Sequence, residues 1–398
     1  MGYHERQSLR QRGQKVCSQI QVEADNNLDR HKTMNVAVAF LGLLLILIIL
    51  WDAFETIILP RRVTRRLRLT GLFYRSIWGP WSSVTKRLRS TKQRENYLGL
   101  FGPLSLIFLL AFWAAGVILG YAIISWSLGE KLNTVEMVNF WTYVYISGTN
   151  FFTLGYGDIT PVEPLGRALA VVEAGTGFAM LAIVIGYLPV LYQAFSLREV
   201  NISLLDQRAG SPSSPAEFLR RHKASGSPQD LNDFLRGWER WAAELLESHL
   251  SYPVLCYFRS QHDNQSWLGA MTTILDTCAL VIVCMGESSA WQARLTFAMA
   301  RHAIVDIAQV FRTAPAKAHG SKGRLSHADF QRLVSIIHPD QDGTADLTEA
   351  EHKLTEMREM YEPYVAALSE LLVMPLPPWI LSEAAIDNWK TSAWGRIQ

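Results

Sequence analysis

The chain has 398 residues and a formal net charge of only +2, with 38 Lys and Arg against 36 Asp and Glu. This balance gives no support to nucleic-acid binding, which draws on a strongly basic surface. Charged residues make up 19% of the chain and apolar residues 49%, whereas soluble domains carry about 25% charged residues. The composition therefore favours a membrane protein.

The four cysteines, Cys17, Cys256, Cys278 and Cys284, show neither a C-x-x-C spacing nor a matching histidine pattern. They predict reduced thiols rather than a disulfide framework or a zinc site. No group of nucleophile, base and orienting residue is recognisable, so an enzyme is the function class that the sequence supports least.

Three segments are long and apolar enough to cross a bilayer as helices, which takes about 20 residues. They are residues 34–59, 96–129 and 165–195, and the second contains no charged residue. No small-residue cleavage site follows the first segment, so we interpret it as a retained anchor rather than a signal peptide. The polar residues 1–33 form a tail without a clear pattern.

The loop after the first span is strongly basic. Its basic residues are Arg61, Arg62, Arg65, Arg66, Arg68, Arg75, Lys86, Arg87, Arg89, Lys92 and Arg94. The positive-inside rule places this loop in the cytoplasm. The N-terminus is then on the outer side of the plasma membrane, and the C-terminal half is in the cytoplasm. Apolar and aromatic residues between Leu69 and Trp81 predict a helix on the inner membrane surface. Asp52 and Glu55 share a helix face and are expected to pair with Arg61, Arg62 or Arg65.

The segment between the second and third spans, residues 141–158, is too short to cross the membrane and return as helices. A short helix followed by extended backbone fits its length. Bare backbone at membrane depth is tolerated only inside protein or beside a water-filled path. Within it, Gly155 and Gly157 alternate with larger residues. Glycine accepts the unusual dihedrals that turn successive carbonyls toward one axis, and rings of carbonyls replace the water of a K⁺ ion.

The run Thr153-Leu154-Gly155-Tyr156-Gly157-Asp158 resembles the signature Thr-Val-Gly-Tyr-Gly-Asp of the potassium channel pore-domain family. The resemblance extends over about residues 100–195, in the order outer helix, pore helix, filter and inner helix. It implies that K⁺ ions bind to the backbone carbonyls, and to one hydroxyl, of Thr153, Leu154, Gly155 and Tyr156. Gly157 and Asp158 would form the outer mouth, where a carboxylate favours cations. One filter segment per chain implies a homotetramer in the lipid bilayer.

Three residues depart from the usual pattern of that family. Leu154 replaces Val or Ile, and Phe152 and Asn150 stand where Thr is common. We therefore expect a different hydrogen-bond network behind the filter. These departures leave a less selective cation channel as one alternative. A membrane-anchored helical interaction or sensor protein is another.

Two residues of the third span are candidates for supporting or moving the filter. Glu173 is an ionisable group at membrane depth, which is costly and usually faces protein or water. We hypothesise that it hydrogen-bonds the pore helix or the filter loop. Gly177 lies one helical turn later, and the family resemblance implies a gating hinge there. Close helix packing through a small residue explains Gly177 equally well, so both interpretations stay open.

The C-terminal half predicts helices joined by turns. Residues 200–230 contain Ser-Pro and Gly-Ser clusters typical of a linker. Helical patterns follow at about 229–258, 265–285, 289–312, 326–337 and 348–372. Ser326 is a candidate cap for one helix, and Thr348 with Glu351 forms a capping-box pattern for another. Neither a dinucleotide-binding nor a cyclic-nucleotide-binding pattern is recognisable, so the ligand or protein partner of this half is unknown.

One segment has partial calcium-loop spacing. With Gly343 at position six, the acidic residues at positions three, five, nine and twelve are Asp340, Asp342, Asp346 and Glu349. His338 stands where the first Asp is usual. We prefer an acidic turn that ends in a helix cap, with a Ca²⁺ site as the alternative.

Together these features predict an all-α membrane protein with three transmembrane helices, a re-entrant pore helix and filter loop, and an all-α cytoplasmic domain. The predicted parts are a tail (1–33), the first span with its basic interfacial linker (34–99), a channel pore domain (100–199), a linker (200–230) and a regulatory or assembly domain (231–398). The predicted function is passive, potassium-selective conduction, gated by the inner helix, with the cytoplasmic domain as a second candidate for gating.

Overall fold

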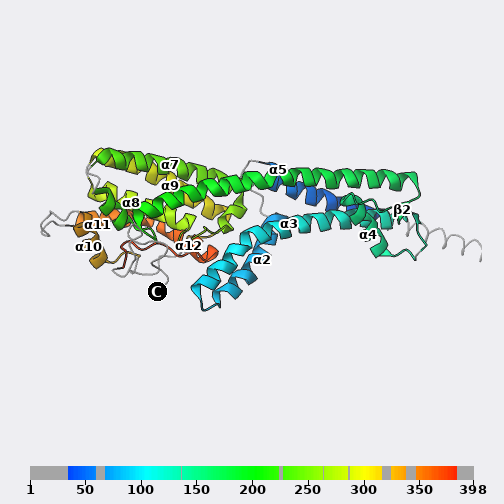
Figure 1. Cartoon of the computed structure of the whole chain (residues 1–398), viewed down its shortest axis with the longest axis horizontal. Helices are drawn as coiled ribbons and strands as arrows, with labels where there is room; N and C mark the ends of the chain where they lie inside the picture. The colour runs from blue at the N-terminus through cyan, green and yellow to red at the C-terminus, as the bar shows by residue number, and fades with distance from the viewer. Residues whose placement is uncertain are drawn as a thin grey trace, which may run out of the picture. The chain divides into compact units, whose positions relative to one another are not determined.

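The computed structural model describes residues 35–59, 68–135, 137–223, 227–262, 264–285, 287–315, 324–337 and 347–382. Nearly all of these residues lie in helices (Figure 1). The strands in this part of the chain are β1 (Leu132–Asn133) and β2 (Thr160–Pro161), which pair antiparallel. The all-α fold class is therefore confirmed.

Three helices coincide with the predicted spans and are long and apolar enough to cross a membrane. They are Asn35–Ile58, which ends in a π-helical turn at Phe54–Ile58, α3 (Thr91–Ser127) and α5 (Pro164–Ala209). The described residues form two compact units. The first unit contains those of 1–58, 68–70 and 108–186, and the second those of 59–67, 71–107 and 187–398. The division falls inside α3 and α5, and the domain boundaries expected near residues 99 and 199 stay a prediction.

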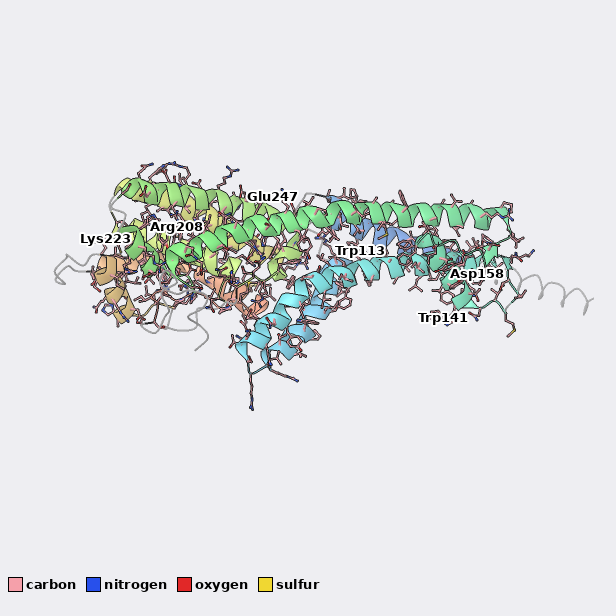
Figure 2. The ribbon with its side chains drawn as sticks, in the orientation of Figure 1. Trp113, Trp141, Asp158, Arg208, Lys223 and Glu247 are labelled. Carbon is pink, nitrogen blue, oxygen red and sulfur yellow. The ribbon has the colours of Figure 1, made fainter. Side chains whose placement is uncertain are left out.

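A buried carboxylate, Asp52, organises the end of the first helix. Its two oxygens accept hydrogen bonds from the Thr70 amide at 3.1 and 3.2 Å and from the Thr70 hydroxyl at 2.5 Å. The indole of Trp113, labelled in Figure 2, donates to it at 3.0 Å. Because Thr70 lies in the first turn of α2 (Leu69–Lys86), Asp52 satisfies an amide that the helix itself cannot pair.

Glu55, on the same face as Asp52, accepts a hydrogen bond from Trp51 Nε1 at 2.7 Å and lies 3.9 Å from Arg68 Nε. The other expected partners, Arg61, Arg62 and Arg65, lie outside the described residues.

The aromatic face of α2 packs against protein, while Leu72 of the same helix is 61% exposed, so contact of α2 with the inner membrane surface stays a prediction. The rings of Trp78 and Phe101 are 4.7 Å apart, and Tyr74 stacks on Tyr257 at 5.5 Å. Trp78 Nε1 also donates to the Leu371 carbonyl at 2.8 Å. The periodically spaced aromatic residues of α2 therefore pack against the core of the second unit.

The second unit is a bundle in which α9 (Glu287–Val310) packs against both α7 (Pro228–Ser251) and α8 (Trp267–Cys284) (Figure 1). The shorter elements are α6 (Pro215–Lys223), the 3-10 helix η2 (Pro253–Tyr257), α10 (His327–Ile337), α11 (Thr348–Glu359) and α12 (Glu362–Leu372). The helical patterns predicted beyond residue 229 match these elements closely.

Two local predictions in this half were wrong. The expected linker at 200–230 is largely helical, because α5 continues to Ala209 and α6 occupies Pro215–Lys223. Thr348 is the first residue of α11 and not its cap; the cap position is Leu347, which makes no side-chain capping bond. The cap predicted at Ser326 is confirmed, since its Oγ accepts from the Asp329 amide at 3.1 Å.

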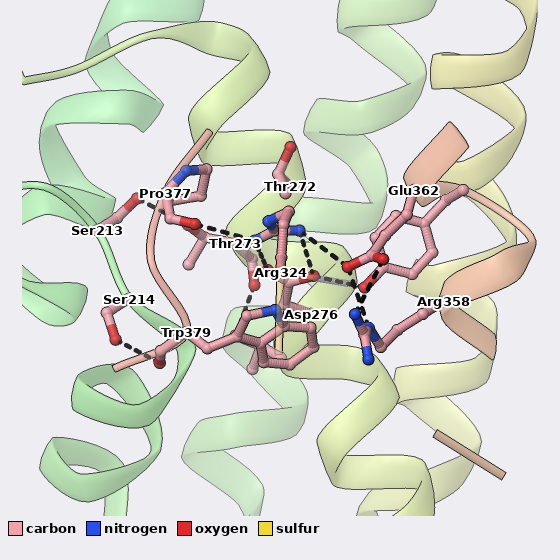
Figure 3. Close-up of polar contacts among 12 residues, drawn as sticks. Ser213, Ser214, Thr272, Thr273, Asp276, Arg324, Arg358, Glu362, Pro377 and Trp379 are labelled. Carbon is pink, nitrogen blue, oxygen red and sulfur yellow. Dashed lines mark hydrogen bonds and ion pairs between the residues drawn. The ribbon is translucent and has the colours of Figure 1, made fainter. Parts of the chain in front are cut away.

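Helix α8 also meets the length and apolarity of a membrane span, but 83% of its most apolar window is buried inside the bundle. Its fully buried Asp276 lies 2.6 Å from Arg324 Nη2 and accepts a hydrogen bond from the Tyr361 hydroxyl at 2.5 Å. Figure 3 shows this network, which extends to Glu362 and Arg358. A buried charge with partners of this kind belongs to a protein core, so α8 is the central helix of the bundle.

Arg198 is a second buried charge, and it joins α5 to the bundle within this unit. Its guanidinium donates to the Leu255 and Phe258 carbonyls, each at 2.9 Å. Its Nη1 lies 3.4 Å from His249 Nε2, while His249 Nδ1 donates to the Leu245 carbonyl at 2.8 Å. Burial lowers the pKa of His249 well below its ordinary value, and the charge of Arg198 lowers it further.

Acidification should destabilise the second unit through His249. The pKa of His249 is lower in the folded state than in the unfolded state. Its contribution to the free energy of unfolding is therefore complete above the unfolded pKa of about 6.5 and is lost as the pH falls below that value. At about pH 5.5 the loss is about 1.4 kcal/mol, or a few degrees in melting temperature. His249→Gln should reduce the difference between melting temperatures at about pH 7.5 and pH 5.5.

His302→Gln is the matched control, because His302 lies on the exposed surface of α9. An unchanged pH dependence in the His249 variant would contradict the assignment.

Candidate ion-binding site

A short helix leads into the candidate filter, as predicted. Helix α4 (Phe140–Phe151) is capped by Asn139, whose side chain accepts from the Thr142 amide at 3.2 Å. The Thr142 hydroxyl accepts from the Asn139 amide at 3.1 Å, which completes a capping box. This capping box fixes the residue at which α4 begins, and thereby the position at which its C-terminal end joins the filter segment.

The backbone of the filter segment alternates between two kinds of conformation. Thr153, Gly155 and Gly157 have positive φ angles of 55°, 60° and 75°, and the residues between them do not. Glycine adopts such angles freely, whereas a β-branched threonine does so at a cost of about 1–2 kcal/mol. Alternation of this kind lets successive carbonyls turn toward one side. A strained residue at the start of the run is typical of a functional site.

The inner end of the filter segment is tied to α4 by its own amides. The Thr153 amide donates to the Asn150 carbonyl at 2.9 Å, and the Leu154 amide donates to the Thr149 carbonyl at 2.8 Å. Beyond this point the side chains of Leu154 and Tyr156 are 51% and 68% exposed in the single chain. Large apolar side chains exposed close together mark a surface that protein or lipid covers.

Asp158 lies at the far end of the segment, in the same region as Trp141 (Figure 2). The Tyr145 hydroxyl donates to its Oδ2 at 2.7 Å, and this hydrogen bond holds the pKa of Asp158 below its usual range. The carboxylate therefore stays charged at neutral pH. The loop around it is closed by β1 and β2 and by the ion pair of Lys131 with Glu163 at 3.5 Å.

Glu173 contacts α4 directly from α5. It is only 3% exposed, and its Oε2 accepts a hydrogen bond from Asn150 Nδ2 at 3.3 Å. Its Oε1 makes a short hydrogen-bond contact with the Ser147 hydroxyl, whose single proton is shared with the Ile118 carbonyl of α3 at 2.8 Å. Three helices thus meet at this carboxyl group. That it supports the filter stays a prediction.

Sequence reasoning missed Ser147 and Tyr145, although a usable signal was present. Ser147 precedes Asn150 by three residues, so both lie on one face of α4, and that face meets Glu173. Asn150 had been noted only as a departure from the family pattern. The structure shows that its side-chain amide donates to Glu173; that the network behind the filter differs from the family's usual one stays a prediction.

Gly177 allows a close backbone contact between α5 and α4. A Cβ atom placed on it would lie 1.9 Å from the Phe151 carbonyl oxygen, whereas a Cβ on Gly175 would meet nothing within 4 Å. A side chain at Gly177 would therefore push α4 away. This favours the packing interpretation; α5 is helical throughout this region, and the hinge stays a prediction.

The candidate calcium ligands Asp340, Asp342 and Asp346 lie outside the described residues. Glu349 is in α11, where its carboxylate pairs with Lys353 Nζ at 2.6 Å. Among the residues that the structure describes, no group of three or more His, Cys, Asp or Glu side chains is placed to hold a metal ion.

Comparison with known proteins supports the resemblance of the filter run. Residues 107–193 match a family model described as an ion channel, which covers α4, the filter segment and parts of α3 and α5. Protein LctB of Geobacillus stearothermophilus is 30% identical over 119 residues, an alignment that covers 26% of this chain and 81% of LctB. No solved structure matches the chain.

Replacing Gly177 by alanine should destabilise the first unit, since the new methyl group overlaps the Phe151 carbonyl. Overpacking of this kind costs about 1–3 kcal/mol, so the melting temperature of the purified protein should fall. Gly175→Ala is the control on the same helix, where alanine is the better helix former by about 1 kcal/mol. Equal melting temperatures for the two variants would refute the close contact.

Replacing Glu173 tests its bonds to α4. Glu173→Leu removes the acceptor of the Asn150 side-chain amide, at a cost of about 1–3 kcal/mol, whereas Ser147 keeps its bond to the Ile118 carbonyl. Glu173→Gln offers one donor and one acceptor, enough for both contacts, and should keep most of the stability. Hydrogen exchange at the Thr153 and Leu154 amides is the measurement. It should accelerate in the leucine variant only, and unchanged exchange there would mean that Glu173 does not hold the filter end.

Proposed function

We propose that this chain, which belongs to the potassium channel pore-domain family, is a subunit of a potassium-selective channel that conducts K⁺ passively across the plasma membrane. Apolar helices and the ion channel region make it a membrane protein. The proposal of potassium-selective conduction rests on the alternation of positive φ at Thr153, Gly155 and Gly157, within the run that resembles the family's filter.

The proposed K⁺ ligands are backbone carbonyl oxygens, with the threonine hydroxyl at the inner end. They belong to Thr153, Leu154, Gly155 and Tyr156. Oxygens from several chains would replace the water shell of the ion, as ion filters do. Asp158, held charged by Tyr145, would raise the local concentration of cations at the outer mouth.

A homotetramer is the assembly that this function needs. One filter segment supplies oxygens from one side only, and a closed cage around an axis takes several copies. The exposed side chains of Leu154, Tyr156 and Phe178, which is 68% exposed, support such an assembly. They lie on the filter and on α5, the two elements that would meet neighbouring copies.

The proposed orientation has the N-terminus outside and the second unit in the cytoplasm. This orientation rests on the basic residues that follow the first span. Arg68, Arg87 and Arg89 belong to this group and lie in the part of the chain that the structure describes. Gating would act through α5, because this single helix contributes residues to both units. The second unit would be the regulatory part, with an unknown ligand or protein partner.

A less selective cation channel is the second candidate. The observation that favours it is the bond from Asn150 to Glu173, because the support behind the filter then differs from the family's usual pattern. Reversal potentials in mixed Na⁺ and K⁺ separate the two. A potential that follows the K⁺ gradient alone supports the selective channel, and one near zero supports the alternative.

Potassium flux into liposomes tests conduction itself. Gly155→Ala forces a side chain onto a residue with φ of 60° and should abolish the flux. Gly148→Ala, in the neighbouring helix α4, is the control, because a Cβ there meets nothing within 4 Å in the subunit. It should conduct like the unaltered protein. No flux from the unaltered protein would overturn the proposed function.

A further inference from the structure

Helices α3 and α5 are both much longer than a bilayer requires (Figure 1). They have 37 and 46 residues. At 1.5 Å per residue these lengths are about 55 and 70 Å, against a hydrocarbon core of about 30 Å. The filter segment follows α3 and precedes α5 in the chain, so the other ends of the two helices extend beyond the opposite side of the membrane. These extensions, up to Ile107 in α3 and from Tyr187 in α5, belong to the second unit.

Each helix contains a proline close to the point where it passes from one unit to the other. Pro103 lies just before this point in α3, and Pro189 lies just after it in α5. A proline inside a helix removes a backbone hydrogen bond and is a usual site of bending. Both extensions can therefore turn relative to the rest of their helices. Their position depends on what holds them in the second unit.

Residues 252–259 of the second unit contact the extension of α5. The Phe258 ring centroid is 5.6 Å from that of Phe195. The buried guanidinium of Arg198 donates to the Phe258 carbonyl at 2.9 Å. A buried charge whose partners are backbone carbonyls is costly to displace, so this segment and α5 are held together firmly.

The same segment also contacts the extension of α3. The Phe258 ring lies so close to Gly102 that a Cβ atom there would be 2.7 Å from its Cδ2. Arg259 lies 3.5 Å from Glu95 Oε2, and it donates to the Leu372 carbonyl at 2.7 Å. Phe258 is only 3% exposed. Its ring therefore fills the space between α3 and α5.

We propose that Phe258 is a positioning residue, which sets the spacing between the extensions of α3 and α5 and through which the second unit controls the gate. This role rests on the proposed channel function and names the part of the second unit that regulates it. The ring of Phe258 packs on α3 and its carbonyl is bound by Arg198 of α5, so a shift of residues 252–259 moves both helices together. Helix α5 also carries Glu173 and Gly177, so the shift reaches the contacts behind the filter.

Alanine at Gly102 tests the contact in the full-length protein. Gly102→Ala forces a methyl group against the Phe258 ring. Gly99→Ala is the control on the same helix, because a Cβ there meets its nearest atom at 4.0 Å. In single-channel recordings, Gly102→Ala should change the open probability by about threefold or more, with unchanged conductance and reversal potential. Gly99→Ala should match the unaltered protein. A role in stability alone would change the number of active channels and not the open probability of each.

A second substitution tests whether the two residues act as a pair. Added to Gly102→Ala, Phe258→Leu makes room for the methyl group and should return the open probability to within about twofold of the unaltered protein. Phe297→Leu is the matched control, because Phe297 is a buried ring of the bundle that packs on Tyr361 at 5.8 Å. It should give no rescue. Equal open probabilities for the two alanine variants, or equal effects of the two leucine substitutions, would overturn the proposal.

Hydrogen exchange separates a failure of this inference from a failure of the channel proposal, because it needs no current. The α5 amides around Arg198 should exchange several times faster in Gly102→Ala than in Gly99→Ala, since the displaced segment loosens its hold on α5. This difference in a protein that passes no K⁺ would reject the channel and keep the link between the helices. Normal K⁺ currents with equal exchange and equal open probability would reject the link and leave the channel standing.

Discussion

The proposed channel depends on one constraint: a stretch of backbone at membrane depth must keep its carbonyls unpaired and still hold its shape. Neither a helix nor a sheet can meet this requirement, since both consume the carbonyls. The chain meets it at Thr153–Gly157 with alternating positive φ, two glycines and one strained threonine. Hydrogen bonds from the Thr153 and Leu154 amides to the end of α4 hold only the inner end of this segment. The rest of the order must come from outside the segment.

The proposed source of that order is the fit of α5 against α4. Glu173 reaches Ser147 and Asn150 through side chains, and Gly177 lets the two backbones touch at Phe151. The two contacts are one helical turn apart and act together, because the carboxyl can reach α4 only where no side chain keeps the helices apart. A movement of α5 would therefore reach the residues that carry the filter. This gives the proposed gating by α5 a physical route.

Much of the first unit was predictable because its signals are local. Charge-free spans and the Gly-x-Gly run are each visible within a short window, and the spans and α4 lie where these signals placed them. The failures share a different cause. The segment 200–230 has the composition of a linker, yet α5 runs through its first third because Ile202 and Leu205 are buried in the bundle. The sequence pattern also gave no sign that the aromatic face of α2 contacts Tyr257, a residue far along the chain. Pattern alone does not reveal which partner a face will have.

Helix α5 shows how a partner changes the meaning of a pattern. Its C-terminal part has apolar residues on two sides. The sequence of this segment therefore shows no single apolar stripe and no clear amphipathic periodicity. Once Leu191, Ile202 and Leu205 are assigned to the bundle, the remaining residues Leu197 and Leu204 fall on a regular seven-residue spacing. The second apolar face becomes visible as a pattern only after the burial of the first face is known.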